Sequence, residues 1–186
     1  MPAKLQKKEV LFTIGHSTRT IGEFIDLLKA YNIQRIVDVR TIPGSRHNPQ
    51  FNENIIDLSL QKVGINYVHI AELGGLRHTT VNSKNLGWHN LSFRGFADYM
   101  ATPEFAKGIE ILENIAKKEK TAIMCAEAVP WRCHRSLIAD ALTKRGWNVF
   151  DIMTLKTASK HRLTPFLKVR QGKLTYPKQR YDSLSV

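Results

Sequence analysis

The sequence is short of acidic residues, of cysteine and of long apolar runs, and each shortage excludes a class of protein. Sixteen acidic residues against 28 Lys and Arg in 186 positions leave a formal net charge of +12, which suits a negatively charged partner. Two cysteines do not make a disulfide scaffold, so we expect a reducing compartment. No stretch approaches the roughly 20 apolar residues of a membrane span, and residues 1–12 lack the pattern of a secretory signal. We therefore expect a cytoplasmic protein with no membrane partner.

Apolar segments of two kinds alternate along the chain. Short runs typical of buried strands lie at residues 9–14, 33–39, 65–70, 121–124 and 147–153. Between them, apolar residues recur at helical spacing, for example after Thr20, which stands at capping-box distance from Glu23. The alternation predicts an α/β fold, with a single domain, a mostly parallel open sheet of about five strands, and helices on both faces.

The segments between the first predicted strands and the C-terminal half have less regular apolar patterns. Residues 52–63 are predicted to form a helix that turns Ile55, Ile56 and Leu58 inward, and Thr102-Pro103 opens another helix. Residues 77–94 have no periodicity, and residues 96–100 are read as a short helical turn.

The C-terminal end is strongly basic. We place the α/β domain at residues 9–155 and a basic tail or small hairpin at residues 156–186, which hold eight Lys or Arg and one acidic residue. A hairpin around Gln171-Gly172 is expected within it.

Reactive or ionisable residues follow four of the five predicted strands. Because the carboxyl ends of parallel strands meet at one edge of a sheet, residues far apart in the chain are expected to converge there. These residues are His16, Ser17, Asp38, Arg40, Glu72, Cys125 and Glu127.

Residues 121–136 contain both cysteines and allow more than one interpretation. In the first, Arg132 and Arg135 flank the start of a helix, whose free N–H groups favour phosphate, and Arg40 adds a bidentate contact. In the second, Cys125 is a nucleophile activated by the helix start and the nearby arginines. Arg132 lies seven residues beyond Cys125, one more than a cysteine-phosphatase loop requires.

Two further interpretations concern the cysteines alone. Metal binding by Cys125, Cys133 and His134 is disfavoured, because this spacing matches no common zinc motif. Alternatively, both cysteines are small buried hydrophobic residues.

Several short motifs together resemble one family. They are Thr13-Ile-Gly-His-Ser17, Asp38-Val-Arg40, Pro43-Gly-Ser-Arg46 with Phe51 and Asn52, Leu73-Gly-Gly75, Cys125-Ala-Glu127 and Cys133-His-Arg135. In combination, across roughly Leu11 to Asp151, they resemble the domain of unknown function 488 family. The resemblance implies a small cytoplasmic α/β protein with no agreed activity. It also marks a polar set, namely His16, Ser17, Asp38, Arg40, Ser45, Cys125, Glu127, Cys133, His134 and Arg135.

These observations favour an enzyme of hydrolase type that acts on a phosphate-bearing substrate, foremost a nucleic acid or nucleotide. The predicted catalytic residues are His16, Asp38, Cys125 and Glu127. The predicted substrate-binding residues are Ser17, Arg40, Ser45, Arg46, Arg132, His134 and Arg135. No cofactor is predicted. The alternatives are a cysteine-dependent sulfurtransferase or phosphatase-like enzyme, and a non-catalytic module that binds nucleotides or nucleic acid. The substrate, the bond acted on and the oligomeric state stay open.

Overall fold

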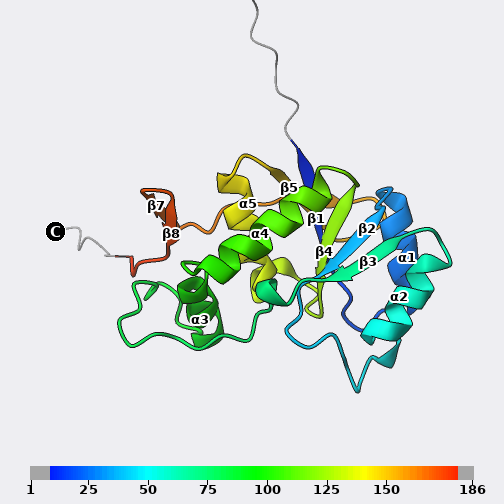
Figure 1. Ribbon diagram of the computed structural model, residues 1–186, viewed down its shortest axis with the longest axis horizontal. Coiled ribbons are helices and arrows are strands. Elements are labelled where there is room, and N and C mark those ends of the chain that lie inside the picture. Colours follow the sequence, from blue (N-terminus) through cyan, green and yellow to red (C-terminus); the bar gives the residue numbers. More distant parts are fainter. Residues whose placement is uncertain (1–8, 180–186) are drawn as a thin grey trace, which may run out of the picture.

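The computed structural model describes residues 9–179 (Figure 1). The first eight residues, part of the segment in which no secretory signal was expected, and residues 180–186 of the predicted tail lie outside this range. Among the described residues, no helix combines the length and apolar character needed to cross a membrane.

A six-stranded sheet forms the centre of the molecule, in the order β3-β2-β4-β1-β5-β6. Five strands run parallel, and β6 joins the edge antiparallel to β5. The strands are β1 (Val10–Gly15), β2 (Arg35–Asp38), β3 (Asn66–His69), β4 (Thr121–Cys125), β5 (Asn148–Ile152) and β6 (Ala158–Lys160). The predicted α/β fold with a mostly parallel sheet is confirmed.

Helices cover both faces of this sheet (Figure 1). The helices are α1 (Ile21–Ala30), α2 (Glu53–Gln61), α3 (Leu91–Tyr99), α4 (Pro103–Ala116) and α5 (Arg135–Lys144). Apolar side chains of α1 and α2 form one core cluster with the sheet, while those of α3, α4 and α5 form a second cluster on the opposite face. The two clusters hold the parallel strands in place from both sides.

Local capping signals set several helix ends. Thr20 accepts the backbone N–H of Glu23, whose carboxylate accepts in return from the N–H of Thr20, and this is the predicted capping box of α1. Thr102 caps α4 by accepting the backbone N–H of Phe105, without a reciprocal bond, and Pro103 lies in the first turn.

Two predictions about the helices were wrong. Helix α3 begins at Leu91, because the side chain of Asn90 caps its first turn, so it is longer than the predicted turn at residues 96–100. In α2, Ile56 is buried as predicted, but Ile55 and Leu58 are exposed and Leu60 takes the inner position. Ile56 and Leu60 are four residues apart and share one face of the helix, whereas Leu58 lies on the other side.

The C-terminal segment packs against the domain. Strand β6 was not predicted, since its three residues carry no apolar pattern. The expected hairpin forms from β7 (Lys168–Arg170) and β8 (Lys173–Thr175), with Gln171 and Gly172 at positive φ in its turn. Beyond it, Tyr176 is fully buried in the core on the α4 and α5 side.

The strand order decides where the site lies. Strand β4 sits between β1 and β2, with Cys125 paired in register to Gly15, and Asp38 paired to Met124. The carboxyl ends of these three central strands are therefore adjacent.

Candidate functional site

A cavity of about 450 Å³ opens at the carboxyl ends of β1, β2 and β4, and we call it the site pocket. The predicted site residues that line it are His16, Arg40, Ser45, Cys125, Glu127, Arg132 and His134. Cys133 and several apolar side chains, including Ile42, Leu76 and Phe93, complete its wall. The convergence expected from strand topology thus brings most of the predicted polar set to one cavity.

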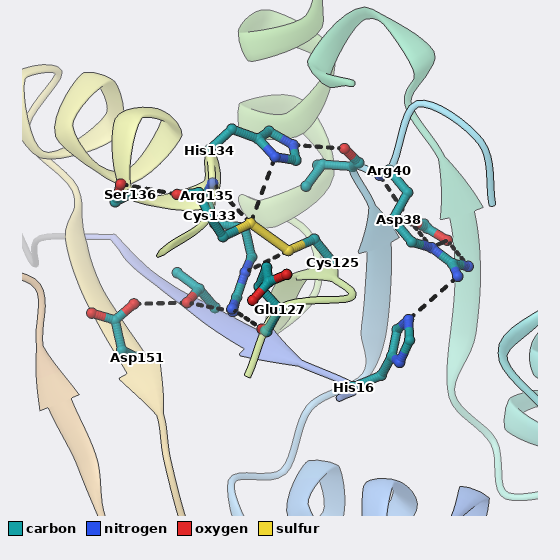
Figure 2. The surroundings of a disulfide bond; sticks show 12 residues. His16, Asp38, Arg40, Cys125, Glu127, Cys133, His134, Arg135, Ser136 and Asp151 are labelled. Atoms are coloured by element: carbon teal, nitrogen blue, oxygen red, sulfur yellow. Dashed lines mark hydrogen bonds and ion pairs between the residues drawn. A yellow bond between two sulfur atoms is a disulfide. The ribbon is translucent and has the colours of Figure 1, made fainter. Parts of the chain in front are cut away.

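The two cysteines meet in the wall of this pocket. Cys125, the last residue of β4, and Cys133, just before α5, are joined by a disulfide (Figure 2). Both side chains are buried against protein on their other sides. Their Cα atoms are 7.7 Å apart, wider than the roughly 4.4–6.8 Å of most disulfides. The same backbone therefore also suits the separated thiols of a reduced pair.

Arg135 lies directly behind the cysteines and is 1% exposed. Its Nε donates to Cys125 Sγ at 3.2 Å, its Nη1 donates to Thr13 Oγ1 at 3.2 Å, and its Nη2 donates to the carbonyl of Glu127 at 2.6 Å (Figure 2). Within residues 9–179, it has no carboxylate partner at ion-pair distance. Burial lowers the pKa of Arg135 to about 10, so the guanidinium is still charged at neutral pH.

Such an arrangement favours an anionic sulfur. A buried cation that is not ion-paired to a carboxylate is stabilised by a further neighbouring negative charge, and a thiolate on Cys125 would supply one at 3.2 Å. Cys133 Sγ in turn accepts the backbone N–H of Arg135 at 3.5 Å, at the start of α5. Both sulfur atoms thus receive N–H donors.

Gly15 makes the close approach behind the site pocket feasible. A Cβ atom at this position would lie 1.8 Å from the carbonyl oxygen of Glu127 and 2.9 Å from Arg135 Nη2. The β1–β4 pairing also continues past the strand ends, because His16 N and Ser17 N donate to the carbonyls of Cys125 and Ala126. Only glycine lets the two turns pack this tightly.

His134 presents an unprotonated nitrogen to the sulfur atoms. Its Nε2 lies 2.8 Å from the carbonyl oxygen of Val39, which only accepts, so Nε2 carries the hydrogen and Nδ1 has the free lone pair. Nδ1 lies 3.6 Å from Cys133 Sγ (Figure 2). Burial lowers the pKa of His134 to about 4, and the ring is therefore neutral at pH 7.

His16 is neutral for the same reason. Burial lowers its pKa to about 4, and its Nδ1 donates to the carbonyl of Ser17 at 2.8 Å. Nε2 carries no hydrogen and accepts from Arg40 Nη1 at 3.5 Å, and the imidazole ring stacks on Phe51. His16 therefore carries no charge at neutral pH, and its lone pair points toward Arg40 beside the site pocket.

Asp38 is fully buried and holds Arg40 by bidentate contacts. Tyr67 donates to the same carboxylate at 2.8 Å. Burial and the Asp38 charge both raise the pKa of Tyr67, and Asp38 raises the pKa of Arg40 against the effect of burial. Asp38 compensates the charge of Arg40 and occupies its Nε and Nη2. Nη1 remains, and it faces His16 beside the pocket.

The remaining predicted residues lie at the edge of the site or behind it. Asp38 lies behind Arg40, and Arg135 lies behind Cys125. The carbonyl of Ser17 accepts the hydrogen bond from His16, and the backbone of Ser17 has a positive φ of 51°. Arg46 is exposed, and it does not line the site pocket. Glu127 and Arg132 are at the exposed rim.

Sequence reasoning missed a polar chain behind the pocket. Thr13, which accepts from the buried guanidinium, donates to Asp151 Oδ1 at 2.7 Å. His161 lies 3.6 Å from Asp151 and 2.9 Å from Asp140, and Tyr176 donates to Asp140 at 3.0 Å. Of these residues, Thr13 and Asp151 lie near the carboxyl ends of predicted strands, where topology could have revealed them.

The fold and site define a class of protein: a mostly parallel α/β domain with a two-cysteine pocket, backed by a buried arginine, at the ends of its central strands. The chain belongs to the family described as the domain of unknown function DUF488, whose model matches residues 20–142. The match contains both cysteines, Asp38 and Arg135, while His16 precedes it. No curated protein and no solved structure matches the chain.

Proposed function

We propose that this chain is a thiol-dependent enzyme that acts on a small substrate with an electrophilic sulfur, such as a disulfide or a persulfide. The observation that carries the proposal is the contact between the sulfur atoms of Cys125 and Cys133 in the site pocket, with Arg135 donating to Cys125. A nucleophilic thiolate next to a cation, with a second cysteine in reach, is the arrangement that thiol exchange needs.

The reaction proceeds in two displacements. The Cys125 thiolate attacks one sulfur of a substrate R–S–S–R, forms a mixed disulfide and expels the thiolate RS⁻. The Cys133 thiol, 3.6 Å from the lone pair of His134 Nδ1, then loses its proton to the expelled thiolate. The Cys133 sulfur attacks Cys125, closes the internal disulfide and expels the second RS⁻. Two equivalents of a small thiol restore the dithiol and are themselves oxidised to a disulfide.

The arrangement of Arg135 argues against a phosphatase-like mechanism. Its three nitrogens donate to Cys125, Thr13 and Glu127 inside the protein, which leaves the guanidinium turned away from a phosphoryl group in the pocket. Arg132, the residue at nearly the phosphatase spacing, is exposed at the rim. Thiol exchange needs no arginine that binds a phosphoryl group, because the sulfur of Cys133 attacks the mixed disulfide on Cys125.

The test is stoichiometric. The reduced protein is mixed with a chromogenic aromatic disulfide, and the released thiolate is counted while the protein mass is measured. We expect two equivalents from the wild type, one from C133S with the adduct held on Cys125, and only slow release from C125S. The rim variant R132A serves as the matched control and should behave as wild type. An adduct on Cys133, or a rate no faster than that of a free cysteine, would falsify the proposal.

A second candidate is the hydrolase-type enzyme on a nucleic acid or nucleotide. The observation in its favour is Arg132, an exposed cation at the mouth of a pocket that also presents neutral His16 and Ser45, on a chain of net charge +12. Arg132 would bind phosphate, and His16, which lines the same pocket, would orient the attacking water.

Binding to single- and double-stranded DNA and RNA, measured against salt concentration, tests this candidate. We expect a steep salt dependence that becomes shallower by about one charge in R132Q. If H16N binds equally well but loses turnover, the hydrolase is supported. If the wild type binds nucleic acid but shows no turnover, the result supports a non-catalytic binding module instead of a hydrolase. Absence of binding at low salt would contradict both the hydrolase and the binding module.

A further inference from the structure

We propose that the reduced forms of Cys125 and Cys133, together with His134, bind one soft divalent cation of the zinc class. The sulfur atoms of the two cysteines and Nδ1 of His134 all lie within 4.8 Å of one another. This inference concerns the same side chains as the thiol exchange proposed above but goes beyond it, because it assigns them a second, non-catalytic ligand.

The ligand spacing suits a tetrahedral ion. Zinc binds sulfur at about 2.3 Å and imidazole nitrogen at about 2.0–2.1 Å, so a tetrahedral angle between them separates the two ligand atoms by about 3.6 Å. The distance from Cys133 Sγ to His134 Nδ1 is 3.6 Å. One edge of the coordination polyhedron is therefore already present.

The second edge forms when the disulfide is reduced. Two zinc-bound sulfurs stand about 3.8 Å apart by the same geometry, and the bonded sulfurs of Cys125 and Cys133 must separate to reach that distance. The Cα spacing of 7.7 Å, which exceeds the ordinary disulfide range, leaves room for this separation without a large backbone shift.

Each ligand atom is in the state that metal binding requires. The hydrogen bond from His134 Nε2 to the Val39 carbonyl keeps the lone pair on Nδ1 and orients the ring, as the partners of metal-bound histidines do. Arg135 donates to both sulfurs, through Nε to Cys125 and through its backbone N–H to Cys133. These donors favour the deprotonated thiols that bind metal.

The fourth coordination position faces the site pocket, which both cysteines and His134 line. A water molecule or a small ligand can therefore complete the tetrahedron, as in zinc sites with three protein ligands. Because the metal and the internal disulfide use the same two sulfurs, the two states exclude each other. The metal-bound state withholds Cys125 from attack, and oxidation of the cysteines releases the ion.

The spacing of these residues along the chain disfavoured a metal site, since two thiols three or four residues apart are absent. The tertiary structure nevertheless brings the three ligand atoms together. Strand β4 ends at Cys125, and the turn through Pro130–Arg132 returns the chain so that Cys133 and His134 face it.

Titration of the reduced, metal-free protein with Co²⁺ under anaerobic conditions tests the inference. We expect one equivalent to bind, with a sulfur-to-cobalt charge-transfer band, intense visible bands typical of tetrahedral Co²⁺, and displacement by Zn²⁺. Oxidation with a small disulfide should release one ion per internal disulfide. The H134A variant should bind at least about tenfold more weakly, while H89N, at an exposed loop histidine, should match the wild type.

The decisive comparison is with the C125S C133S double variant. If reduced wild-type protein binds no more Co²⁺ than this variant, the metal site does not exist. That result leaves the thiol exchange intact, because two equivalents of thiolate would still be released from a chromogenic disulfide. Conversely, stoichiometric metal binding by a protein whose Cys125 reacts no faster than a free thiol would support the metal site and remove the proposed enzyme.

Discussion

Arg135 Nε donates to Cys125 Sγ at 3.2 Å, from a side chain that solvent hardly reaches. The contact predicts that Arg135 keeps the Cys125 thiol in its thiolate form near neutral pH. Substitution R135M should lower the rate of iodoacetamide alkylation of Cys125 at pH 6.5 by about tenfold or more, while R135K should retain part of it. The rates are measured by mass spectrometry on the C133S background.

A folding check accompanies this measurement, because loss of a buried arginine also disturbs packing. The ratio of the alkylation rates at pH 6.5 and pH 9.5 isolates the thiolate effect from changes in access. In R135M the ratio should fall relative to C133S alone, and R132A should leave it unchanged. An unchanged ratio in a folded R135M protein would mean that the cation does not activate the sulfur.

The buried Asp38–Arg40 pair predicts a large loss of stability when one partner is removed. D38N leaves the Arg40 charge buried without its counter-charge, which costs about 3–5 kcal/mol. Y67F removes one hydrogen bond to the same carboxylate and should cost about 1–3 kcal/mol. Urea unfolding measures both, and a D38N cost no larger than that of Y67F would show that the pair contributes little.

His161 predicts a stability that depends on pH. Burial alone would lower its pKa, but the hydrogen bonds to Asp140 and Asp151 raise it to about 9 in the folded protein. Against about 6.5 in the unfolded chain, this shift stabilises the fold by on the order of 3 kcal/mol, fully below pH 6.5 and less as the pH rises through 9.

The variant H161N tests this sign. The difference in unfolding free energy between wild type and H161N should be largest near pH 6 and smallest above pH 9.5. The exposed H89N variant should show no such trend. A difference that grows with pH would contradict a charged His161 in the folded state.

Gly75 lies against the His134 ring, and a Cβ there would be 2.4 Å from Nδ1. G75A should therefore displace the ring from Cys133, cost about 1–3 kcal/mol in stability, and slow closure of the internal disulfide after the first displacement. G22A, in the exposed part of α1 with nothing nearer than 4.0 Å, is the matched control. It should stabilise the protein by up to about 1 kcal/mol. Equal effects of the two changes would exclude a positioning role for Gly75.

Local patterns were enough to predict most of the fold. The apolar runs at β1 to β5, the Thr20–Glu23 capping box and the Thr102-Pro103 helix start act over a few residues, so their effect can be read directly from the chain. Strand β6 and the true start of α3 escaped prediction because β6 is a short polar edge, and because a single Asn90 cap outweighed weak periodicity.

The sequence by itself determined an alternation of strands and helices, and with it the gathering of strand-end residues at one edge of a parallel sheet. Only the tertiary structure decided which of them touch. The order that places β4 between β1 and β2, and the turn that returns Cys133 and His134 to Cys125, depend on packing between distant segments. For the same reason Arg135, predicted to bind an external anion, lies behind the pocket with its nitrogens held by Cys125, Thr13 and Glu127. No local pattern specifies this burial, and because of it Arg135 contacts the sulfur of Cys125 instead of an external anion.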